Sequence, residues 1–168
     1  MCIRDRIIVS SPILFSTSYA CAILVTCVIS FHIIGDNLAK GHSVSHLFAW
    51  YEIVMHNGNV ALLGIALLVN DMEVELEFLV FPAVFGIAYV AWAAIYANFI
   101  SGVFIYDFMD YRMRGAPVIY LALLSLQTLF FFVVMALDII AESNIILAAV
   151  IITAMTWKIS TIKEPSQG

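Results

Sequence analysis

The fold is decided by the stretch from Val118 to Ile140, which reads VIYLALLSLQTLFFFVVMALDII. Apart from Asp138 it carries no formal charge, and it is longer than the ~20 residues that an α-helix needs to cross a bilayer. Pro117 stands directly before it, where the first turn of a helix tolerates proline. We therefore expect a membrane-spanning helix over this stretch.

The whole chain shares this apolar character. Its 168 residues are 64% hydrophobic and 11% charged, with a mean hydropathy of +1.05, whereas soluble domains are about half apolar and a quarter charged. This composition excludes a soluble globular enzyme and a disordered chain. Seven Lys and Arg against 12 Asp and Glu also exclude the basic stripe of a nucleic-acid binder. Membrane lipids are the expected partners.

Polar breaks divide the chain into five apolar runs, at about residues 13–34, 44–69, 78–106, 118–140 and 145–160. The runs are too long for barrel strands and do not alternate, and lipid admits only helices or closed barrels. We expect an all-α integral membrane helical bundle with four to five transmembrane helices. The last run is short, so it is either a fifth span or an interfacial helix.

This bundle forms one domain over residues 7–163, followed by a polar tail, 164–168. The opening hexamer, residues 1–6, does not resemble a native start, and we treat it as a non-native scar outside the fold. The five runs place most Lys and Arg on one side of the membrane, and the acidic loop with Glu73, Glu75 and Glu77 on the other. Positive charge in short loops marks the cytoplasmic side. We expect a multi-pass protein of the endoplasmic reticulum or plasma membrane.

The densest set of polar residues lies in the second run. Glu52, His56 and Asn59 are spaced four and three apart, which places them on one helix face. His56 falls near the middle of the run, and ionisable residues at that depth are costly and tend to be functional. We expect His56 to be a general base, Glu52 to orient it, and Asn59 to donate a hydrogen bond to substrate or oxyanion. The alternative is a structural histidine bonded to Glu52.

A second polar set consists of His32, Asp36, His42 and His46. Pairs of such residues four apart can bind a metal, so a metal-dependent lipid-modifying enzyme is an alternative function. Two of the histidines, however, fall in a glycine-containing interfacial loop, where polar side chains need no special explanation. The preferred interpretation therefore includes no metal and no cofactor.

Three motifs resemble those of a known family. They are MHNGNVALL at residues 55–63, YVAW at 89–92 and SGVFIYDFMD at 101–110. Together they resemble the androgen-induced protein family, which includes the rolling-stone-like proteins, over about residues 48–137. Members have a midspan His, often with Asn three residues later, then a Tyr-x-x-Trp span that ends in Gly-x-Trp-x-Tyr-Pro-Phe-Leu-Glu/Asp. This chain departs from the pattern with Phe104 in place of Trp and Asp107 in place of Pro.

The resemblance implies a six-span membrane protein and an activity. Some members hydrolyse fatty acid esters of hydroxy fatty acids with a Thr nucleophile and a His, and His56 matches that His. The family's Thr lies two spans before its His, and one span precedes His56 here, so Thr17 and Thr26 are in the wrong span. We expect a C-terminal fragment of a threonine-type lipid ester hydrolase, inactive by itself. A non-catalytic multi-pass protein, a scaffold or lipid-binding protein, is the alternative.

Overall fold

The computed structural model describes residues 3–70 and 72–163, with side chains from residue 11 onward. The described chain is helical and contains no strand, which confirms the all-α expectation. Of the expected segments, the polar tail at 164–168 lies outside the described residues, as do residues 1–2 of the opening hexamer.

Four stretches within the described chain are long and apolar enough to cross a membrane. They are Ser11–Ala39, Trp50–Val69, Leu76–Ser101 and Ala116–Ser143. The protein is therefore a multi-pass membrane protein. The second stretch begins later than the expected residue 44, because the polar segment before it forms a 3-10 turn, Ser45–Phe48, and not part of the helix.

The spanning stretches are built from several helical segments. The first contains α1 (Ile3–Val28), η1 (Ile29–Ile33) and α2 (Ile34–Ala39); the second contains α3 (Trp50–Ile53), η3 (Val54–Gly58) and α4 (Asn59–Val69); the third contains η4 (Leu76–Leu79), α5 (Val80–Tyr96) and η5 (Ala97–Ser101); the fourth is α6 (Ala116–Ser143). The segments η1, η3 and η5 are each a single π-helical turn. A π-turn is rare and often occurs at a functional site.

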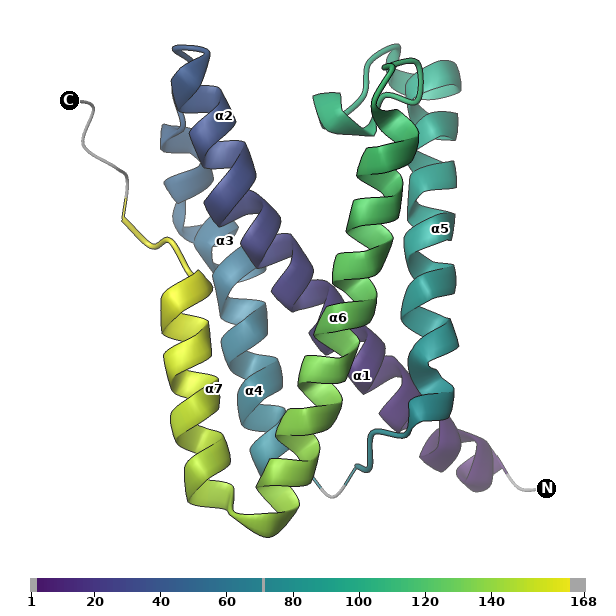
Figure 1. The fold of residues 1–168 in the computed structure, drawn as a ribbon, viewed down its shortest axis with the longest axis vertical. Helices are drawn as coiled ribbons and strands as arrows, with labels where there is room; N and C mark the ends of the chain where they lie inside the picture. The colour runs from purple at the N-terminus through teal and green to yellow at the C-terminus, as the bar shows by residue number, and fades with distance from the viewer. Residues whose placement is uncertain (1–2, 71, 164–168) are drawn as a thin grey trace.

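The helix α1 crosses the molecule diagonally and continues into α2; α3, α4 and α7 lie on one side of it, α5 lies on the other, and α6 crosses it (Figure 1). It contacts α4, α5, α6 and α7. The last helix, α7 (Ile145–Ile159), begins where the Asn144 side chain accepts a hydrogen bond from the Leu147 N–H at 3.0 Å. It then runs alongside α4 (Figure 1) and packs on α4 and α6.

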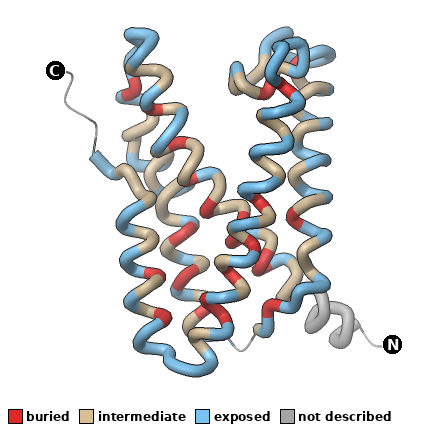
Figure 2. Tube along the Cα trace, in the orientation of Figure 1, coloured by how far each residue is buried: buried red, intermediate tan, exposed pale blue. Residues whose placement is uncertain are grey.

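The core lies where α1 crosses the other helices, as the buried segments in Figure 2 show. Its largest fully buried side chains include Tyr19 and Ile23 of α1. Gly64 of α4 allows the closest approach, because a Cβ there would lie 2.6 Å from Ile152 Cγ2 and 3.0 Å from Tyr19 Oη. Small residues let membrane helices approach in this way. Most other large apolar side chains are exposed, as expected for a surface that meets lipid.

Candidate functional site

The candidate site is built on the second spanning helix, where Glu52 of α3 and His56 of η3 are in contact. His56 Nε2 lies 2.8 Å from Glu52 Oε2, as the spacing of four predicts. Both side chains are largely buried, with 20% of His56 and 22% of Glu52 exposed. A neutral imidazole that donates its Nε2–H to Glu52 has its lone pair on Nδ1. The pair can therefore accept a proton at Nδ1 and stabilise the resulting imidazolium with the carboxylate.

The backbone of this site is held by a residue from the first span. Thr26 of α1 is fully buried, and its Oγ1 donates a hydrogen bond to the His56 carbonyl. His56 lies in the π-turn Val54–Gly58, where the regular i to i+4 bonding of the helix is interrupted. A buried carbonyl without a partner is costly, so the Thr26 hydroxyl stabilises this irregular turn. Thr26 contacts the backbone of His56 and not the ring.

Asn59 does not join Glu52 and His56. Its side chain is exposed and donates to the Met55 carbonyl in the same helix. The physical reason is the π-turn, which contains more residues per turn than an α-helix and so rotates Asn59 away from the face predicted by regular spacing. Asn57 instead makes a long-range contact, with its Nδ2 3.4 Å from the Thr161 carbonyl beyond the end of α7.

His56 lies closer to one end of the spanning helix than the sequence indicates. The helix begins at Trp50, so His56 is about 9 Å along a helix of about 30 Å at the usual rise per residue. The expected position near the midplane assumed that the span began at residue 44. The site therefore lies about a third of the way into the span.

The loop after η5 approaches the same end of the bundle. Tyr106 stacks on Phe108 with ring centroids 5.4 Å apart, and Phe108 meets the His32 ring edge-on at 5.4 Å. Burial raises the pKa of Tyr106, and the nearby Tyr89 and Glu52 raise it further. The sequence predicts only aromatic packing for Tyr106 and Phe108. The contact of Phe108 with His32 joins residues that are far apart in the chain, which no local spacing reveals.

The second polar set does not converge. His32 contacts Phe108, Asp36 pairs with Lys40 at 2.7 Å, and His42 and His46 are exposed. Within the described residues, no group of three or more His, Cys, Asp or Glu is arranged to hold a metal ion. The alternative of a metal-dependent enzyme requires such a group, so this part of the chain gives it no support.

The chain matches no protein-family model, no curated protein and no solved structure. The resemblance to the androgen-induced protein family therefore depends on the sequence motifs alone.

Two pockets lie elsewhere on the molecule, and neither is lined by Glu52 or His56. One, of about 400 Å³, lies at the end of α7. The other, of about 190 Å³, lies between the ends of α4 and α6, where the buried Asp138 accepts a hydrogen bond from the Val74 N–H at 2.8 Å. A substrate would therefore reach His56 through neither of these two pockets.

Proposed function

We propose that this chain provides the general base of a membrane-embedded lipid ester hydrolase, with His56 as the base and Glu52 as the residue that orients it. The observation that carries the proposal is the 2.8 Å hydrogen bond between them, in a π-turn of a membrane-spanning helix. A carboxylate bonded to one imidazole nitrogen leaves the other nitrogen ready to accept a proton, as in hydrolases that use a histidine base.

In the proposed reaction the nucleophile is a threonine hydroxyl, as the family resemblance implies. His56 takes the hydroxyl proton while the oxygen attacks the ester carbonyl, and the imidazolium then gives the proton to the departing alcohol. Water, deprotonated by the same histidine, releases the acyl group as a fatty acid, and the imidazolium returns that proton to the threonine oxygen. Glu52 stabilises the imidazolium in both steps. The substrates would be fatty acid esters of hydroxy fatty acids, reaching the site from the bilayer.

The test is ester hydrolysis by a form of the protein that contains the proposed threonine nucleophile, reconstituted in nanodiscs. His56→Ala should lower kcat/KM by ~10³-fold or more, the usual cost of losing the base of a nucleophile. His32→Ala is the matched control and should retain activity, since His32 contacts Phe108 and not Glu52. Wild-type turnover by a folded His56→Ala protein would refute the proposal.

A non-catalytic role, as a scaffold or lipid-binding protein, is favoured by a different observation. Neither the pocket at the end of α7 nor the one between the ends of α4 and α6 is lined by Glu52 or His56. A purely structural pair predicts that Glu52→Gln and His56→Ala lower the free energy of unfolding while no ester hydrolysis is detected for any variant or for the parent protein.

A further inference from the structure

The chain beyond α7 forms a feature that the proposed function does not use. α7 has 15 residues, which at the usual rise span about 22 Å, less than the ~30 Å of the hydrocarbon core. The chain leaves the helix at Ser160 and continues without regular structure to Lys163. We therefore expect residues 160–163 to complete the crossing and to lie where hydrocarbon gives way to headgroups.

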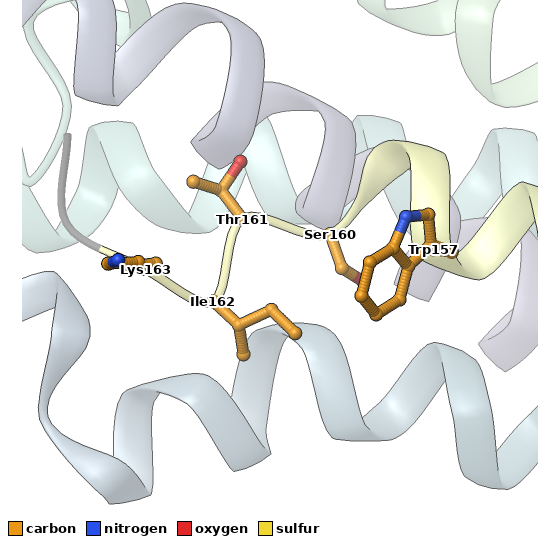
Figure 3. Close-up of a pocket in the computed structure, with 5 residues that line it drawn as sticks. All are labelled: Trp157, Ser160, Thr161, Ile162 and Lys163. Carbon is orange, nitrogen blue, oxygen red and sulfur yellow. The ribbon is translucent and has the colours of Figure 1, made fainter.

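A pocket of about 400 Å³ lies at this turn, lined by Trp157, Ser160, Thr161, Ile162 and Lys163. Figure 3 shows the Trp157 ring beside Ser160, with Thr161, Ile162 and Lys163 following along the extended chain. The pocket therefore brings together a large aromatic ring, hydroxyl groups and an amino group within a short segment.

The polar groups here need partners, because non-helical backbone at membrane depth is tolerated only against protein or a polar cavity. Asn57 binds the Thr161 carbonyl at 3.4 Å and fixes the segment to η3. The Ser160 Oγ is buried and has no hydrogen-bond partner among the described residues. Because this hydroxyl is covered, the polar group of the pocket that is exposed to a ligand is the Lys163 ammonium.

The other residues that line the pocket indicate which ligand fits. Trp157 is 76% exposed and Ile162 is 52% exposed, and tryptophan at the end of a membrane helix typically lies at headgroup level. Lys163 adds a positive charge, which attracts anionic lipids near the bilayer surface. The C-terminal end of α7 carries partial negative charge that opposes an anion, so any attraction must come from the lysine.

We propose that this pocket binds the phosphate headgroup of an anionic phospholipid. The Lys163 ammonium contacts the phosphate, and Trp157 and Ile162 pack against the upper part of the acyl chains. A lipid is the source that suits the pocket, because free phosphate would leave both apolar side chains uncovered. The site is independent of the Glu52–His56 pair and does not require ester hydrolysis.

The test uses the tryptophan in the pocket as the probe. The chain has three tryptophans, so replacing Trp50 and Trp92 by Phe leaves Trp157 as the single reporter. The protein is placed in phosphatidylcholine nanodiscs that contain brominated phosphatidylglycerol or, separately, the same amount of brominated phosphatidylcholine. We expect several-fold stronger quenching by the brominated phosphatidylglycerol.

Two lysines near the same membrane face provide the control. Lys163→Gln should abolish the preference for phosphatidylglycerol, whereas Lys158→Gln should keep it, because Lys158 does not line the pocket. Equal losses in both variants would overturn the proposal in favour of general attraction to a charged surface. Loss of quenching on addition of inorganic phosphate would overturn it in favour of a soluble anion site.

A second measurement guards against misfolding of the tryptophan-substituted protein. Native mass spectrometry of the unsubstituted chain, released from mixed phosphatidylglycerol and phosphatidylcholine micelles, should show retained phosphatidylglycerol. Lys163→Gln should lose that adduct, while Lys158→Gln should retain it. The absence of any retained phosphatidylglycerol on the parent protein would overturn the proposal.

Discussion

Thr26→Val should destabilise the bundle, although valine has nearly the same shape as threonine. Thr26 is fully buried and donates to the His56 carbonyl, so the substitution leaves no cavity but removes one interhelical hydrogen bond. Such bonds contribute about 0.6 kcal/mol on average in membranes, and up to about 1.7. The carbonyl in the π-turn loses its side-chain partner, which places the expected loss near the upper value, about 1–2 kcal/mol.

The measurement is reversible unfolding in mixed micelles titrated with sodium dodecyl sulfate, followed by circular dichroism. Thr17→Val is the matched control on the same helix, because the Thr17 Oγ1 is buried and has no hydrogen-bond partner among the described residues. Removing an unsatisfied buried hydroxyl should leave stability unchanged or raise it. Thr26→Ser should restore most of the loss. Equal changes for Thr17→Val and Thr26→Val would refute the role given to Thr26.

Two further predictions concern packing and a loop contact. Gly64→Ala should lower the free energy of unfolding by about 1–3 kcal/mol through overpacking, because its Cβ would lie 2.6 Å from Ile152 Cγ2. Gly86→Ala is the control, since a Cβ there meets nothing within 4 Å. In the same titration it should leave stability unchanged or raise it. Asp138→Leu should speed hydrogen exchange at the Val74 amide, since that N–H donates to the Asp138 carboxylate at 2.8 Å. Asp138→Asn keeps an acceptor and should preserve the protection of this amide. Unchanged exchange in Asp138→Leu would contradict the contact.

Much of the fold could be predicted because membrane insertion depends on local hydropathy. The run from Val118 to Ile140 is predominantly apolar, and the structure forms α6 there. The start of the second span was less predictable. Its first residues, from Val44, include apolar side chains, but the polar residues among them allow a 3-10 turn, and the helix begins only at Trp50.

The candidate site was predictable only where it depends on regular spacing. Glu52 and His56 are one turn apart and meet as expected. Asn59 does not, because the π-turn before it has no recognisable sequence pattern and changes the helical register. The Thr26 contact joins residues that are 30 positions apart, and no periodicity within one helix can reveal a partner on another.

The central position of α1 has a consequence for biogenesis. The helix α1 packs against α4, α5, α6 and α7. It is synthesised before these four helices, and each of them contacts it in the finished bundle. While the second span is still being made, the Thr26 hydroxyl has no access to the His56 carbonyl, its partner in the finished bundle. Co-translational assembly should therefore begin with the pairing of α1 and α4, and the helices made afterwards should dock onto that pair as they leave the insertion machinery.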